Sequence, residues 1–155
     1  MVSEQRYVLV IDDHSIIAQG CQYQFTQAGL PWTVQWVPSL HTAEGLPVPE
    51  LGAADGLPVP DLAVLDLRLE DGSTPTQNLH EIERRGLPVI AYTSAESPIL
   101  VREAIAGGVL AIVRKSGPSS DLVLAIQDAL DGRPSASLDW AAALDADEDF
   151  VGDYL

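Results

Sequence analysis

The chain has 155 residues, 46% of them apolar, and a formal net charge of −15. This length suits one domain with at most a tail, and the apolar content supports a packed core and argues against disorder. A chain with this much negative charge repels the phosphate backbone of nucleic acids. We therefore expect it to bind nucleic acid poorly by itself. No apolar run approaches the length of a membrane span, no signal peptide is recognisable, and the single cysteine, Cys21, excludes an internal disulfide. These features predict a cytoplasmic protein that does not enter a membrane.

Five short apolar runs recur along the chain with little polar alternation, which is typical of strands covered on both faces. They are Tyr7–Ile11, Trp32–Val37, Leu62–Leu65, Pro88–Tyr92 and Leu110–Val113. Apolar residues at helical spacing lie between most of them, and Thr74-Pro75-Thr76-Gln77 is a helix-start signal with a capping box. The alternation predicts an α/β fold: a five-stranded parallel sheet in the flavodoxin-like order 2-1-3-4-5, with helices on both faces.

The stretch between the second and third predicted strands departs from this alternation. Two near copies, EGLPVPEL and DGLPVPDL, begin at Glu44 and Asp55, and their four prolines forbid a continuous helix. We therefore expect the second crossover helix to be short, broken or absent. The duplication is interpreted as a loop, with a surface that contacts a partner as the alternative.

Polar residues collect where four of the predicted strands end. Asp12 and Asp13 follow the first strand, Asp66 the third, Thr93 the fourth and Lys115 the fifth. The carboxyl ends of parallel strands share one edge of the sheet, so these side chains are expected to lie together. Clustered carboxylates repel one another unless a cation lies among them, and a site with only oxygen ligands suits Mg²⁺ better than Zn²⁺. With a hydroxyl and an ammonium to hold phosphate oxygens, the set fits phosphoryl transfer, and Asp66 is the candidate nucleophile.

Four segments, in this order and spacing, resemble the receiver domains of bacterial two-component response regulators: VLVIDDH, LAVLDLRLEDG, VIAYTSAE and IVRKSG. The resemblance covers roughly residues 6–132. It implies that Asp66 accepts a phosphoryl group from a sensor histidine kinase and that the chain, although it could lose this group by itself, is not a turnover enzyme. It also implies site roles: direct Mg²⁺ contacts from Asp13, Asp66 and the backbone carbonyl of Arg68, contact mostly through water from Asp12, and phosphoryl contacts from Thr93 and Lys115.

A narrower resemblance is to NarL/LuxR-type regulators, which carry a C-terminal helix-turn-helix. The segments DDHSIIAQG, LDLRLEDGS and DWAAALDADEDF support it. It implies a receiver domain over residues 1–132, followed in residues 133–155 by a short helix, Leu138–Leu144, and an acidic linker toward a DNA-binding domain that this chain lacks. It further implies a homodimer on activation, contact with DNA only through that absent domain, and regulation of transcription.

Two departures leave alternatives open. Ile112 stands where receivers usually place an aromatic residue three positions before the lysine. The second departure is the disrupted second helix. Both favour the alternative of a degenerate receiver that regulates through a partner or ligand without phosphorylation, whereas the intact acid, threonine and lysine set opposes it. A phosphohydrolase resembling the haloacid-dehalogenase family needs an acid two residues after the nucleophile, and Arg68 occupies that position. Such an enzyme is therefore the least favoured function.

Three further residues near these motifs have simpler expected roles. His14 is expected to lie exposed at the start of the first helix, with a direct role in the site as the less favoured alternative. Trp32 and Trp36 flank the second strand and are expected to be packing groups.

Overall fold

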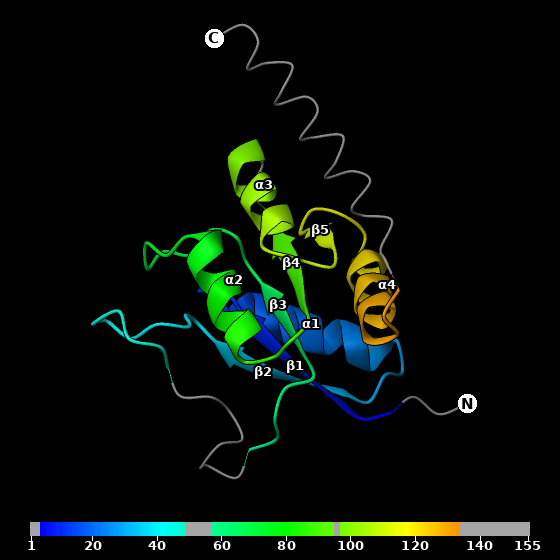
Figure 1. The fold of residues 1–155 in the computed structure, drawn as a ribbon. Coiled ribbons are helices and arrows are strands. Elements are labelled where there is room, and N and C mark those ends of the chain that lie inside the picture. Colours follow the sequence, from blue (N-terminus) through cyan, green and yellow to red (C-terminus); the bar gives the residue numbers. More distant parts are fainter. Residues whose placement is uncertain (1–3, 49–56, 95–96, 134–155) are drawn as a thin grey trace, which may run out of the picture.

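In the computed structural model, the described residues (4–48, 57–94 and 97–133) contain one five-stranded sheet in the order β2-β1-β3-β4-β5, with all neighbours parallel (Figure 1). The strands are β1 (Arg6–Ile11), β2 (Trp32–Val37), β3 (Leu62–Leu65), β4 (Val89–Thr93) and β5 (Ile112–Arg114). The helices are α1 (Ser15–Gln27), α2 (Pro75–Arg84), α3 (Pro98–Ala106) and α4 (Ser119–Leu130). The fold class and strand order expected from the sequence are confirmed.

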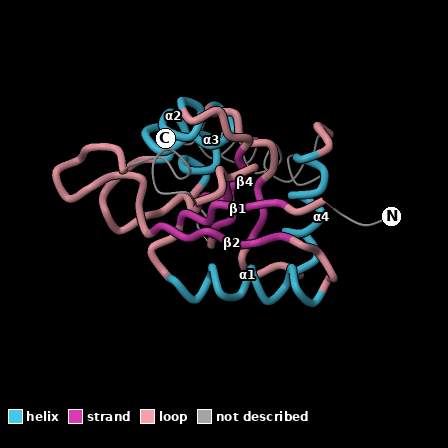
Figure 2. Tube along the Cα trace, turned by 90° about the horizontal axis from the view of Figure 1, so that it is seen from below, coloured by secondary structure: helices cyan, strands magenta, loops and turns pink. Residues whose placement is uncertain are grey.

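Two layers of helices enclose the sheet. Successive residues of a strand point to opposite faces of the sheet, so the apolar side chains of one strand pack against both layers. Val8 and Val10 of β1 pack in the cluster that includes the buried residues of α1 and α4. Leu9 and Ile11 pack in the cluster that includes the buried residues of α2 and α3. Figure 2 shows α1 on one side of the sheet and α2 and α3 on the other. Burial on both faces explains why the central strands β1, β3 and β4 are continuous apolar runs in the sequence, whereas the edge strand β2 is only partly buried.

The strand register aligns the carboxyl ends of the sheet. Ile11 is paired with Leu65, Leu65 with Ala91, and Thr93 with Arg114. The fourth and fifth strands start later than their apolar runs and extend to Thr93 and Arg114. This brings the residues that follow β1, β3 and β5 to the same edge as the last residue of β4.

The start of α2 has the capping box that the sequence predicts. The Thr74 hydroxyl accepts a hydrogen bond from the Gln77 backbone N–H at 3.1 Å, and the Thr74 N–H donates to Gln77 Oε1 at 2.9 Å. Two of the otherwise unpaired N–H groups at the helix start are thereby satisfied. At α3, Ser97 occupies the N-cap and Pro98 the first turn, but the Ser97 side chain makes no capping hydrogen bond.

The connection between β2 and β3 contains no helix in residues 38–48 and 57–61, in agreement with the expected loss of the second crossover helix. A tight hairpin follows β2 instead, in which the Val48 N–H donates to the Leu40 carbonyl at 2.8 Å. Leu40 is fully buried in the cluster that α2 and α3 cover, so the hairpin supplies an apolar side chain to that face. Part of the GLPVP duplication lies outside the described residues, and so does the helix expected at Leu138–Leu144.

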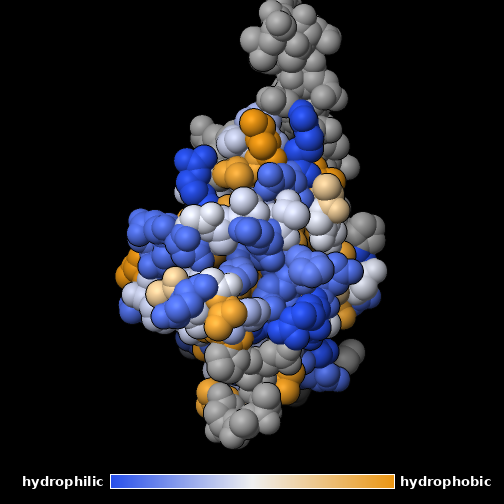
Figure 3. Space-filling model, turned by 60° about the vertical axis from the view of Figure 1, so that its left-hand side comes forward, coloured by the Kyte–Doolittle hydropathy of each residue, from blue (hydrophilic) through white to orange (hydrophobic). Residues whose placement is uncertain are grey.

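Polar residues cover much of one face of the domain. In the face drawn in Figure 3, hydrophilic residues dominate and the apolar ones form separate patches. Within the described ranges, every helix is too short or too polar to cross a bilayer.

Candidate functional site

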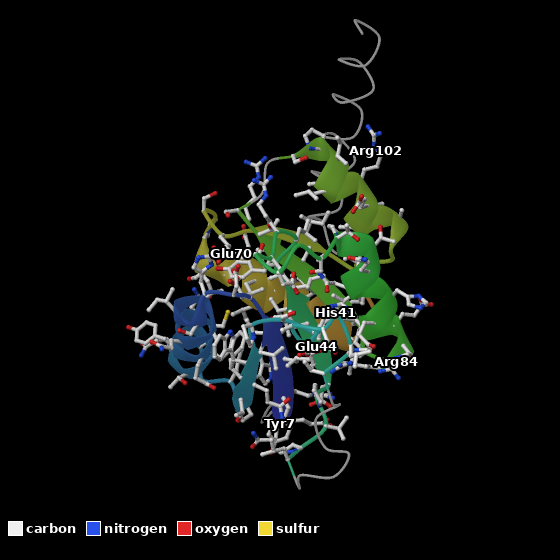
Figure 4. The ribbon with its side chains drawn as sticks, turned by 90° about the vertical axis from the view of Figure 1, so that its left-hand side faces the viewer. Tyr7, His41, Glu44, Glu70, Arg84 and Arg102 are labelled. Atoms are coloured by element: carbon white, nitrogen blue, oxygen red, sulfur yellow. The ribbon has the colours of Figure 1, made fainter. Side chains whose placement is uncertain are left out.

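The expected strand-end residues meet at the carboxyl edge of the sheet. Asp12 and Asp66 directly follow β1 and β3, Thr93 ends β4, and Lys115 directly follows β5. The opposite edge carries the start of β1, and Figure 4 shows Tyr7 and Glu70 at opposite ends of the sheet. Asp12, Asp66 and Thr93 are buried, which is unusual for side chains of this polarity unless they are paired.

The Asp66 carboxylate lies at the centre of the site and is only 5% exposed. Its Oδ1 accepts hydrogen bonds from the Thr93 hydroxyl at 3.1 Å and from the Arg68 backbone N–H at 3.2 Å. Its Oδ2 lies 3.3 Å from Lys115 Nζ. Burial raises the pKa of Asp66, while the positive charge of Lys115 and the Arg68 N–H act in the opposite direction. The site thus holds a carboxylate in a poorly hydrated position with donors on both oxygens.

Asp12 is tied into the same network and is 1% exposed. Lys115 Nζ lies 2.6 Å from Asp12 Oδ2, so one ammonium bridges the acids that follow β1 and β3. Asp12 Oδ1 accepts a hydrogen bond from the His14 backbone N–H at 2.9 Å. The Asp12 backbone carbonyl accepts one from the Trp36 indole at 2.7 Å. These contacts fix both the side chain and the main chain of Asp12.

Trp36 differs from the expectation that it is only a packing group. It is 42% exposed, whereas Trp32 is buried and packs edge-on against Phe25 with ring centroids 5.2 Å apart. The parallel register pairs Trp36 with Val10, two residues before Asp12, and the long indole reaches forward to the Asp12 carbonyl. The sequence could not indicate this contact, because it depends on the side-chain conformation at an edge strand.

Asp13 lies on the outer side of this network. Its Oδ2 accepts a hydrogen bond from the Glu70 backbone N–H at 2.9 Å, which connects the β1 end to the loop after β3. Its Oδ1 is shielded from solvent and accepts no hydrogen bond of good geometry. His14 lies at the N-terminus of α1, as expected, with a side chain that is 61% exposed and an Nδ1 atom 2.9 Å from Asp13 Oδ1. One Asp13 oxygen is therefore available for a further ligand.

The donor set fits a divalent cation. Ligand atoms of Asp12, Asp13 and His14 all lie within 4.8 Å of one another. Asp66 joins this group through the shared Lys115, and the Arg68 peptide is held beside it by the N–H contact with Asp66. Several anionic oxygens at close range, one of them unpartnered, are the arrangement that an oxygen-preferring ion such as Mg²⁺ stabilises. The structure thus brings all six expected residues to one edge, with Asp13 outside the hydrogen-bonded centre and Arg68 joined to it through its backbone N–H.

A comparison with protein families agrees with this geometry. A family model described as "Response regulator receiver domain" matches residues 8–127. No curated protein is similar enough to the chain to count as a match.

Solved structures share the fold at low sequence identity. A two-component response regulator of the LuxR family from Aurantimonas sp. SI85-9A1 is 22% identical, with 95% of this chain and 99% of that chain covered and a TM-score of 0.65. A CheY-like response regulator receiver domain protein from Methanospirillum hungatei JF-1 is 21% identical, covering 83% and 96%, with a TM-score of 0.62. The RcsB response regulator of Salmonella typhimurium is 19% identical, with a TM-score of 0.65, and the match covers 92% of this chain but 67% of RcsB.

Proposed function

The chain belongs to the family of response regulator receiver domains, and from this premise we propose that it accepts a phosphoryl group from a sensor histidine kinase on Asp66. The single observation that carries the proposal is the surroundings of Asp66. A buried carboxylate has Thr93, Lys115 and the Arg68 N–H within 3.3 Å, contributed by three different segments at the edge of the sheet. A purely structural aspartate needs partners, but it does not need a second bridged carboxylate beside it and a third one with a shielded oxygen that accepts no hydrogen bond.

The proposed reaction is a transfer between two nucleophiles. A carboxylate oxygen of Asp66 attacks the phosphorus of a phosphohistidine, and the bond from phosphorus to nitrogen breaks. The electron pair stays on the imidazole nitrogen, which takes up a proton, and the product on this chain is an acyl phosphate. Thr93 and Lys115, already in contact with the two Asp66 oxygens, are placed to hold the phosphoryl oxygens without a large rearrangement.

Mg²⁺ is the cofactor that this proposal includes. Asp13, Asp66 and the Arg68 carbonyl would hold it, with Asp12 contributing mainly through water. When bound, the ion neutralises negative charge on the carboxylates and on the incoming phosphoryl group. Asp12 and Asp66 share one ammonium in the structure, so a second cation at this edge reduces the remaining repulsion among three acids.

The proposed output is a change of partner. Phosphorylation adds charge beside Thr93 at the end of β4, and a shift of Thr93 toward the phosphoryl group would alter the surface formed by β4, α3 and β5. We assign the chain to a cytoplasmic transcription regulator of the NarL/LuxR type, which dimerises on activation and contacts DNA through a separate domain. One similar solved structure is described as two RcsB dimers bound to two parallel DNAs, and the proposed output is drawn by analogy with it.

Ile112 is buried in the core cluster with α2 and α3, so a swinging aromatic ring is not part of the proposed switch.

The test is covalent labelling with a small phosphodonor. Acetyl phosphate and Mg²⁺ are added to the chain, and intact mass is followed together with oligomeric state. The wild type is expected to gain one phosphoryl group, Asp66→Asn to gain none, and Asp131→Asn, which removes an exposed acid after α4, to behave as wild type. A wild type without an adduct, or an adduct that persists in Asp66→Asn, overturns the proposal and leaves the degenerate receiver as the better description.

A further inference from the structure

The imidazole of His14 lies against the proposed cation site, although the site already has enough oxygen ligands without it. Its Nδ1 atom is 2.9 Å from Asp13 Oδ1 and 3.4 Å from Asp12 Oδ1. Three ligand atoms, two oxygens and one nitrogen, thus lie within 4.8 Å of one another at the outer side of the site.

The spacing of these atoms matches that of neighbouring ligands on one ion. Two atoms each about 2.1 Å from a metal are about 3.0 Å apart at a right angle and about 3.4 Å apart at a tetrahedral angle. The two separations in the structure, 2.9 and 3.4 Å, lie close to these values. The first is also a hydrogen-bonding distance, yet Asp13 Oδ1 accepts no hydrogen bond of good geometry. The pair therefore has the distance of a hydrogen bond without its direction.

Neither helix capping nor core packing accounts for the orientation of the ring. His14 is the N-cap residue of α1, where a side chain ordinarily accepts a hydrogen bond from the first turn, but its side chain makes no capping hydrogen bond. It is also 61% exposed, so core packing does not hold it in place. What the described residues offer to the ring nitrogen is the pair of carboxylates.

We propose that His14 binds the cation of this site directly through Nδ1 and makes the site prefer Mn²⁺ over Mg²⁺. The inference rests on the cation site of the proposed function and adds a nitrogen ligand to it. Imidazole suits transition-metal ions, whereas carboxylate, carbonyl and water oxygens alone suit Mg²⁺. The added ligand thus strengthens binding of Mn²⁺ and leaves binding of Mg²⁺ almost unchanged.

The competing explanation is that His14 is only a charge partner of Asp13. A charge partner affects every divalent ion in the same direction, because it acts through the field at the site and not through a bond to the metal. The ratio of the two affinities therefore separates the explanations, while either affinity alone does not.

The experiment measures both affinities in the full chain without a phosphodonor. The EPR signal of free Mn²⁺ gives its dissociation constant, and competition gives that of Mg²⁺. His14→Ala removes the ligand, and His14→Asn keeps a good N-cap residue in case the alanine variant folds poorly. His80→Ala is the matched control, because it removes an exposed histidine from α2. Pulsed EPR of bound Mn²⁺ reports whether a ¹⁴N nucleus is directly bonded to the ion.

Loss of His14 is expected to weaken Mn²⁺ binding by about tenfold and Mg²⁺ binding by less than about twofold, in both variants. The ¹⁴N coupling should be present in wild type and His80→Ala and absent from both His14 variants. An unchanged affinity ratio, or a wild type without the coupling, overturns this inference alone if Asp66 still takes up a phosphoryl group. A wild type that binds neither ion overturns the cation site of the proposed function as well. Binding through His14 without labelling of Asp66 overturns only the phosphoacceptor role.

Discussion

At the end of β3, the Asp66 side chain combines two opposing influences. Burial disfavours its charged form and raises its pKa, while Lys115 and the Arg68 N–H favour that form without fully compensating. The folded chain therefore holds the Asp66 proton more tightly than the unfolded chain does. The contribution of this group to stability is fully present below its usual pKa of 3.8 and is lost as the pH rises through the higher folded-state pKa.

Asp66→Asn is therefore expected to raise the free energy of unfolding at pH 7 in the absence of divalent ions. The amide keeps the shape of the carboxyl group but carries no charge to be desolvated, and Lys115 retains Asp12 as a partner at 2.6 Å. The difference from wild type should shrink as the pH falls toward 3.8, where the wild-type group also becomes neutral. Urea unfolding at several pH values measures this, with Asp131→Asn as the control. A variant less stable than wild type at pH 7 would show that hydrogen bonding outweighs desolvation at this site.

The sequence predicted the centre of the site better than its outer side. Asp12, Asp66, Thr93 and Lys115 each follow or end a strand, so the geometry of a parallel sheet is sufficient to bring them together. The orientation of the His14 imidazole depends instead on the rotamer of a helix N-cap residue. The only sequence signal for it is its position directly after two acids, and an exposed histidine there is equally compatible with no role.

At the scale of elements, the β2–β3 connection shows a second limit of prediction. Four prolines were enough to predict the loss of a regular helix. They did not indicate what replaces it, because one anchor of the hairpin comes from a distant helix. The Arg85 guanidinium, at the end of α2, donates to the Val48 carbonyl at 2.7 Å across 37 residues of sequence. Such a contact appears only when the fold is assembled.

This anchor gives a prediction about two adjacent arginines. Arg84 and Arg85 both pair with the buried Glu81, and hydrogen bonds from Arg84 are the largest cause of the lowered pKa of Glu81. The Arg84 side chain is 52% exposed, however, so solvent screens its contribution to stability. The Arg85 side chain is 5% exposed and also holds Val48. Arg85→Met is therefore expected to cost about 2 kcal/mol or more, and Arg84→Met less than about 1 kcal/mol.

Chemical denaturation of the two variants measures this difference. Combining Arg85→Met with Glu81→Met should cost less than the sum of the two single changes, because no buried charge is then left without its partner. Equal costs for Arg84→Met and Arg85→Met would show that the buried pair does not anchor the hairpin.

At the scale of the whole molecule, the net charge of −15 acts on the fold and on the site together. Like charges distributed over a small domain repel and destabilise its compact state. The same negative field attracts cations, and the three acids at the carboxyl edge are the place where we propose that one binds.

Two effects of salt should therefore be separable in thermal unfolding. Raising NaCl to about 0.15 M shortens the screening length to about 8 Å, so the unfolding midpoint should rise gradually in every variant. MgCl₂ at equal ionic strength should raise it further and then saturate, because an ion bound only by the folded state stabilises it by mass action. Asp13→Asn removes the carboxylate whose Oδ1 accepts no hydrogen bond. The net charge of the chain changes by only one unit, so the general effect of salt should be nearly unchanged. The substitution should abolish the additional effect of Mg²⁺ and retain that of NaCl; an Mg²⁺ effect that remains intact in this variant would place the cation elsewhere.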